Sequence, residues 1–220
     1  MPLQPPKILE LIFPRILWRG PSNDNGAYLT FDDGPHSHAT PRVLDILQAH
    51  DVHATFFLRG SHIKGAEFVV EQIIHDGHLI ANHSFTHRKL GWCPSRIIQN
   101  EIWDTERIFQ ANHWTYHRLF RPPFGHFRPG MESLLRNMNY RMVMWSIMPG
   151  DFRPLSPERL LARTLGKLKA GAIIVLHDHS SSPDAMITML PKLLSEIEGR
   201  GFQCKRLDEI AELKSTQVTP

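Results

Sequence analysis

Short apolar runs alternate with longer amphipathic stretches along most of this chain. The apolar runs predict strands at 27–31, 54–58, 78–82, 118–120, 140–145, 172–176 and 202–206. Stretches in which apolar residues recur every three or four positions predict helices at 40–50, 65–76, 95–111, 130–138, 157–169 and 184–199. Such repeated alternation indicates a parallel sheet covered by helices, either open or closed into a barrel.

Ionisable residues gather where the predicted strands end. Asp32 and Asp33 follow the first strand, His83 the third, Arg121 the fourth and His177 the strand at 172–176. Asp151 stands a few residues beyond the strand at 140–145. In parallel α/β folds the carboxyl ends of the strands meet at one mouth, so these side chains are candidates for one site.

The segment Thr30-Phe31-Asp32-Asp33-Gly34-Pro35 places two carboxylates side by side at the end of an apolar run. Two like charges at the edge of a core are costly unless a cation or a proton offsets them. The same residues also suit an ordinary turn, because Asp, Gly and Pro all favour turns.

The segment His83-Ser84-Phe85-Thr86-His87 places two imidazoles four residues apart. On one helical turn they would project from the same face and could chelate a cation, although such a pair can also be structural. Together with Asp33 they offer two nitrogen ligands and one oxygen ligand. Such a set suits Zn²⁺ best, and Co²⁺, Ni²⁺, Mn²⁺ and Fe²⁺ are also chemically suitable.

The remaining ionisable residues suit proton transfer. With Asp33 on a metal, Asp32 would stay ionised and could accept a proton from water. Arg121 could orient Asp32 through a forked hydrogen bond. His177 could protonate a leaving group, and Asp151 could raise its pKa. The alternatives are a surface residue in a rigid Pro-Pro turn for Arg121, a satisfied polar residue at a strand end for His177 and a turn residue for Asp151.

Composition narrows the function classes. Of the 220 residues, 41% are hydrophobic and 21% are charged, as in ordinary globular proteins, and the formal charge is only +3. Basic residues are scattered, which argues against nucleic-acid binding. Cys93 and Cys204 lack metal-type spacing and are expected to be free thiols in a loop and a late strand, with a disulfide left open.

The terminal segments show no targeting signal. The apolar residues at 9–14 are too few for a signal sequence or a membrane span, so we expect a cytoplasmic location if the chain is full length. Residues 1–26 are Pro-rich and expected to be irregular. A single domain is predicted over 27–213, followed by a tail at 214–220.

In order, the motifs resemble the polysaccharide deacetylases of carbohydrate esterase family 4, the NodB-type deacetylase domain. The matching segments are 30–34, 83–87, Arg121-Pro122-Pro123-Phe124-Gly125, 145–152 and Val175-Leu176-His177-Asp178. The resemblance covers about residues 27–207. It implies a distorted (β/α) barrel of seven or eight strands, with the site at the strand ends.

The resemblance also implies roles for single residues. Asp33, His83 and His87 would be the metal ligands. Asp32 would be the general base and His177 the general acid, with Arg121 orienting Asp32 and Asp151 tuning His177. The backbone N–H near Phe124 would help to hold an oxyanion.

The motifs depart from the family pattern around the acetyl pocket. The family often has Tyr at the position of Phe124, Trp at that of Phe152 and Leu at that of Val175. Met148 stands where Asp is common. Phe152 and Val175 keep the pocket apolar but change its shape.

From these motifs we expect a metal-dependent hydrolase of carbon–nitrogen amide bonds that removes N-acetyl groups from amino sugars of a glycan. Two alternatives remain: an O-acetyl ester deacetylase of the acetylxylan type, and a carbohydrate-binding barrel without turnover. All five residues needed for turnover are present, which disfavours the silent barrel.

Overall fold

Strand β1 (Gly26–Asp32) is buried along its whole length at the centre of the sheet. The computed structural model describes residues 5–179 and 183–219. β1 pairs in parallel with β7 (Ala172–His177) over its full length. On its other edge it pairs with β8 (Gln203–Lys205) near its start and with β2 (Thr55–Leu58) near its end. A strand covered on both faces explains the continuous apolar run seen in the sequence.

The other parallel strands extend this sheet in the order β6–β5–β3–β2–β1–β7. Their bounds are Leu79–Asn82 for β3, Leu119–Phe120 for β5 and Arg141–Met142 for β6. Isolated parallel bridges, Leu17 with Val143 and Ile147 with Ile174, carry the pairing from β6 round toward β7. The sheet therefore curls into a distorted, partly closed barrel of seven strands, as predicted.

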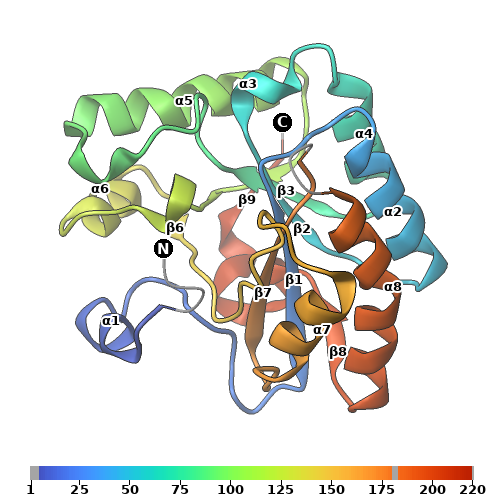
Figure 1. Cartoon of the computed structure of the whole chain (residues 1–220). Coiled ribbons are helices and arrows are strands. Elements are labelled where there is room, and N and C mark those ends of the chain that lie inside the picture. Colours follow the sequence, from blue (N-terminus) through green and yellow to red (C-terminus); the bar gives the residue numbers. More distant parts are fainter. Residues whose placement is uncertain (1–4, 180–182, 220) are drawn as a thin grey trace.

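Helices occupy the predicted positions between the strands and cover the sheet (Figure 1). They are α2 (Ala39–Ala49), α4 (Glu67–His75), α5 (Ser95–Ala111), α6 (Met131–Asn137), α7 (Pro157–Leu165) and α8 (Pro183–Gly199). In Figure 1, α2, α4 and α8 lie on one side of the strands, and α5 and α6 lie on the other.

Several short helical elements were not predicted from the sequence. They are helix α3 (Gly60–Ile63) and the 3₁₀ turns η1 (Leu90–Trp92), η2 (Pro123–Gly125), η3 (Leu207–Glu209) and η4 (Ala211–Thr216). Elements of three to six residues are too short to show a period in the sequence. Turn η2 matters for function because Phe124 and Gly125 border the site described below.

Side chains of β1 alternate between two cores. Leu29 and Phe31 pack into the core between the sheet and the outer helices. Tyr28 packs into a second core inside the barrel, with Phe57 and Trp145. Successive strand residues point to opposite faces, so Asp32 belongs to the barrel interior, at its mouth.

The terminal segments are more ordered than expected. Within residues 1–26, Lys7–Ile12 forms helix α1, and Ile16, Leu17 and Trp18 are buried. The backbone of Leu17 exchanges hydrogen bonds of 3.0 and 2.8 Å with Met142 and Met144. The expectation of an irregular segment is therefore wrong for these residues, because the prolines masked a short helix and a buried bridge.

The tail at 214–220 also joins the fold. Gln217–Val218 forms strand β9, which pairs antiparallel with β4 (Tyr116–His117). Residues 1–4 and 220 of the predicted terminal segments lie outside the described residues. Among the described helices, none is long and apolar enough to cross a membrane.

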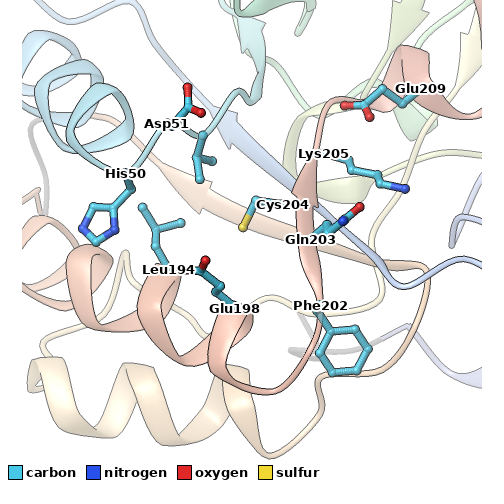
Figure 2. A pocket seen from close by; sticks show the side chains of 10 residues that line it. His50, Asp51, Leu194, Glu198, Phe202, Gln203, Cys204, Lys205 and Glu209 are labelled. Atoms are coloured by element: carbon cyan, nitrogen blue, oxygen red, sulfur yellow. The ribbon is translucent and has the colours of Figure 1, made fainter.

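Cys93 and Cys204 are both free thiols. Cys204 lies in β8 and lines a surface hollow together with Leu194 and Glu198 (Figure 2). Burial raises the pKa of Cys204 to about 12, which keeps the thiol neutral. Because β8 pairs with the first residues of β1, this hollow lies at the amino end of the strands, away from Asp32.

We predict that Leu17→Ala lowers the free energy of unfolding by about 2–5 kcal/mol, because Leu17 is buried within the bridge that helps to close the barrel. Leu11→Ala is the matched control, since Leu11 is 77% exposed and should change stability by less than about 0.5 kcal/mol. Urea unfolding measures both values, and equal stabilities for the two variants would show that the segment is not part of the cooperative fold.

Candidate active site and metal centre

The mouth of the barrel holds a cavity of about 320 Å³. β1 and β7 place Asp32 and His177 directly opposite each other in register at its base. Eight of the ten predicted site residues line it: Asp32, Asp33, His83, His87, Phe124, Phe152, Val175 and His177. The other two, Arg121 and Asp151, are buried and bind Asp32 and His177.

Three side chains converge as a possible metal site. One ligand atom each from Asp33, His83 and His87 lies within 4.8 Å of the other two. Oδ1 of Asp33 is 2.9 Å from Nε2 of His87 and 3.4 Å from Nε2 of His83. Two imidazole nitrogens and one carboxylate oxygen form a set that suits a divalent cation of the zinc type.

Hydrogen bonding on the far side of His83 supports this assignment. Nδ1 of His83 lies 2.7 Å from the carbonyl oxygen of Arg121, so Nδ1 must carry the proton. The neutral ring then presents a bare lone pair at Nε2, facing the carboxylate of Asp33. Oδ1 of Asp33 is buried without a hydrogen-bond donor in the described part of the chain. Lone pairs that face one another in this way fit a cation between them.

The charge on Asp33 is strongly favoured. Burial raises the pKa of this carboxyl, but hydrogen bonds and positive charge from His83 and His87, when their rings are protonated, outweigh burial and hold it well below its usual range. A divalent cation held between the same groups would favour the anion in the same way. Asp33 is therefore an anion at neutral pH, as a metal ligand must be.

The segment that carries the two imidazoles is a loop, so their shared direction does not come from one face of a helical turn. Ser84 and His87 adopt left-handed backbone conformations, with φ of 67° and 61°. Glu101 of α5 holds the loop, because its carboxylate accepts the backbone N–H groups of Phe85 and Thr86 at 3.0 and 2.7 Å. Buried donors that a carboxylate satisfies do not need the hydrogen bonds of a helix.

The two adjacent carboxylates point to different partners. Asp33 has a left-handed backbone, with φ of 75°, which turns its side chain away from that of Asp32. Its carbonyl oxygen accepts a hydrogen bond of 2.9 Å from Nδ1 of His62. Asp32 keeps the strand conformation and meets Arg121 instead.

Arg121 binds Asp32 through one hydrogen bond, so the predicted fork is not formed. Nη1 of Arg121 donates to Oδ1 of Asp32 at 2.6 Å and to Oγ1 of Thr30 at 2.8 Å, while Nη2 donates to the carbonyl of Met144. The guanidinium, which is fully buried, also lies over the ring of Phe57. Dividing its donors among three acceptors leaves Oδ2 of Asp32 free of Arg121.

His177 and Asp151 form the second polar pair. Asp151 accepts the backbone N–H of His177 at 2.7 Å, and its other oxygen lies 2.9 Å from Nδ1 of the same residue. Burial lowers the pKa of His177, but the charge and hydrogen bond of Asp151 outweigh it and raise the value to about 9. The imidazole therefore carries a proton at neutral pH.

Comparison with known proteins agrees with this geometry. The family model for polysaccharide deacetylases matches residues 19–143. A chitooligosaccharide deacetylase of Rhizobium leguminosarum bv. trifolii is 34% identical over 86% of this chain and 93% of its own. A peptidoglycan-N-acetylglucosamine deacetylase of Bacillus cereus is 29% identical over 90% of this chain and 94% of its own.

Comparison with solved structures points to the same family. The crystal structure of the Bc1960 peptidoglycan N-acetylglucosamine deacetylase, bound to an N-hydroxybenzamide compound, superposes with a TM-score of 0.87. It is 27% identical, and the match covers 92% of this chain and 95% of that one. The chain belongs to the polysaccharide deacetylases, carbohydrate esterase family 4. The predicted enzyme class, a hydrolase of amide bonds in polysaccharides, is confirmed.

Apolar side chains line the rest of this deacetylase's cavity. Val175 is buried, Phe152 is 42% exposed and meets the ring of His177 edge-on at 5.4 Å, and Phe124 packs on His87 at 4.5 Å. Met148, at the position where the family often has Asp, is buried and also lines the cavity. One wall of the deacetylase site is thus apolar and the other is charged.

Glu101 is the supporting residue that sequence reasoning missed. Its signal was present, because Glu101 lies on the buried face of α5 with Ile98, Ile102 and Thr105. An acidic residue on such a face needs buried donors nearby. Which donors it finds depends on packing between α5 and the loop after β3.

We predict that Glu101→Gln weakens divalent-metal binding by about 10–100-fold, because the loop that carries His87 loses its charged anchor. The exposed Glu71 of α4 provides the control Glu71→Gln, which should bind metal like the unaltered protein. Zn²⁺ titration calorimetry measures the affinities, and unchanged affinity in Glu101→Gln would remove Glu101 from the support of the site.

Proposed function

We propose that this deacetylase removes N-acetyl groups from amino-sugar residues of a glycan, using a bound divalent metal ion. The observation that carries the proposal is one cavity lined by a metal-ligand triad, an ionisable carboxylate and a protonated imidazole. The names of the relatives, which act on peptidoglycan N-acetylglucosamine and chitooligosaccharide, support an N-acetylated glycan as substrate.

Asp33, His83 and His87 would hold the metal, and their two nitrogens and one oxygen favour Zn²⁺. A bound ion would act as a Lewis acid that polarises the acetyl carbonyl and makes water more acidic. The ligand set uses three protein atoms, as catalytic zinc sites do.

Asp32 acts as the general base in this proposal. Its Oδ1 is held by Arg121, and its free Oδ2 lies 3.9 Å from Nε2 of His83, beside the metal-ligand triad. Oδ2 is therefore directed at the place where water and substrate must meet. Arg121 positions this carboxylate and balances its buried charge.

His177 acts as the general acid. Asp151 binds the Nδ1 side of the ring, so the Nε2 proton is the one available to the cavity. An amide nitrogen is a poor leaving group until it is protonated, and His177 supplies that proton as the carbon–nitrogen bond breaks.

The backbone N–H of Phe124 helps to hold the oxyanion. Phe124 has a left-handed conformation, with φ of 58°, in the turn η2 at the edge of the cavity. Within the described residues, its N–H donates to no protein acceptor, unlike the N–H groups of Gly125 and His126. A free backbone donor beside a reacting carbonyl is the usual element of an oxyanion hole.

An O-acetyl esterase would use the same base, acid and metal ligands, but it would depend less on the general acid. An alkoxide leaves more readily than an amine anion, so an O-acetyl esterase has less need of a permanently protonated acid. The buried Asp151, which keeps His177 charged, favours the amide substrate. The silent barrel is disfavoured because the predicted base, acid and ligands all line one cavity.

The test is acetate release from N-acetylated chitooligosaccharide and from acetylxylan by the Zn²⁺-loaded protein. We expect release from the chitooligosaccharide, and His177→Ala should lower kcat by about 10²–10⁴-fold while Zn²⁺ binding persists. His113→Ala, at an exposed histidine, is the matched control. Release from acetylxylan alone would establish the ester alternative, and near-normal kcat in His177→Ala would refute the acid assignment.

The Asp151–His177 pair predicts a particular pH profile. A raised pKa keeps His177 protonated below about pH 9, and the active acid form is lost as the pH rises through that value. Asp151→Asn retains an oxygen for the backbone N–H but removes the charge, so the pKa should fall and the alkaline limb of kcat should move to lower pH. A pH–rate profile that is the same for both proteins would contradict this coupling.

A further inference from the structure

One tryptophan stands apart from the others. Trp18, Trp114 and Trp145 are 3–6% exposed and Trp103 is 39% exposed, whereas Trp92 is 87% exposed. Core packing therefore accounts for Trp114 but not for Trp92. An indole left almost wholly in water contributes little to folding and is typical of binding surfaces.

The turn that carries Trp92 is held in place although the indole itself is exposed. It ends the turn η1, whose first residue, Leu90, is fully buried. A Cβ at Gly91 would lie 2.6 Å from Nδ1 of His126, so the glycine lets the imidazole pack directly against the turn. The rings of His126 and Trp92 lie 6.2 Å apart. Because the backbone of this turn is already ordered, it loses little conformational freedom when a ligand binds.

The surface continues into the catalytic cavity. His126 follows turn η2, which carries Phe124 and Gly125 of the cavity lining. The ring of Phe124, 47% exposed, lies 4.5 Å from that of His87. We call the three residues Phe124, His126 and Trp92 the aromatic rim. Phe124 contacts the metal-ligand candidate His87, His126 follows two residues later, directly after turn η2, and the ring of Trp92 neighbours that of His126.

We propose that the aromatic rim is a subsite for the glycan chain, in which Trp92 stacks on the pyranose ring of a sugar unit next to the one being deacetylated. This inference rests on the proposed function, since it uses the same substrate. The faces of a β-linked pyranose carry C–H groups, which complement the negative face of an indole. Continuity of the rim with the cavity favours a sugar over a protein partner.

The experiment compares Trp92→Ala with Trp103→Ala, a variant of another partly exposed tryptophan. Substrates are N-acetylated chitopentaose and 4-nitrophenyl acetate, a small ester that reaches the same centre without neighbouring sugars. We expect Trp92→Ala to raise the KM for the pentaose about tenfold, the size of one strong ring contact, and to leave ester hydrolysis unchanged. Trp103→Ala should match the unaltered protein on both substrates.

An unchanged KM for the pentaose in Trp92→Ala, or an equal rise in Trp103→Ala, would overturn the subsite. If the unaltered protein releases no acetate from any N-acetylated glycan, the proposed function fails, and the subsite is then tested by binding alone. Fluorescence titration with the pentaose should give a Kd about tenfold weaker for Trp92→Ala. Equal Kd values for the two proteins would again overturn it.

Discussion

Two adjacent carboxylates at the end of a buried strand are costly to bury, and the groups of the site offset their charges. The left-handed backbone of Asp33 separates the two side chains, so that each meets its own partner. Asp32 is neutralised by Arg121, a fully buried guanidinium that would itself be unstable without that carboxylate. Asp33 faces two imidazoles and the space for a cation between them. Removing any of these charges leaves another one buried and unpaired.

The polar side chains that face the cavity, or the loops that carry them, are hydrogen-bonded, on the side away from it, to groups from other parts of the chain. The carbonyl of Arg121 selects the tautomer of His83, Glu101 of α5 holds the loop before His87, and Asp151 holds His177. The barrel brings these pairs together because its parallel strands all end at one mouth. The apolar wall formed by Val175 and Met148 keeps water away from part of the cavity, which strengthens the charge interactions beside it.

Much of this arrangement could be read from the chain. Burial on both faces leaves a continuous apolar run, which made the strand 27–31 recognisable, and burial on one face leaves a period of three to four, which did the same for the helix 95–111. Both match the structure closely, as β1 and α5. The order of the motifs also placed Asp33, His83, His87 and Asp32 at strand ends, and the structure brings all four to one cavity. These features are local, or follow from the rule that parallel strands share a mouth.

The sequence by itself determined the strand–helix order, the chemistry of the ligands and the family. Only the tertiary structure decided that residues 83–87 form a loop, that Arg121 divides its donors among three acceptors, that Leu17 helps to close the barrel and that Trp92 is left in water. Each of these depends on a contact between segments far apart in the chain, such as Glu101 with Phe85 or Gly91 with His126. The periodicity of a segment shows which of its faces is buried. Which other segment packs against that face is decided only by the tertiary structure.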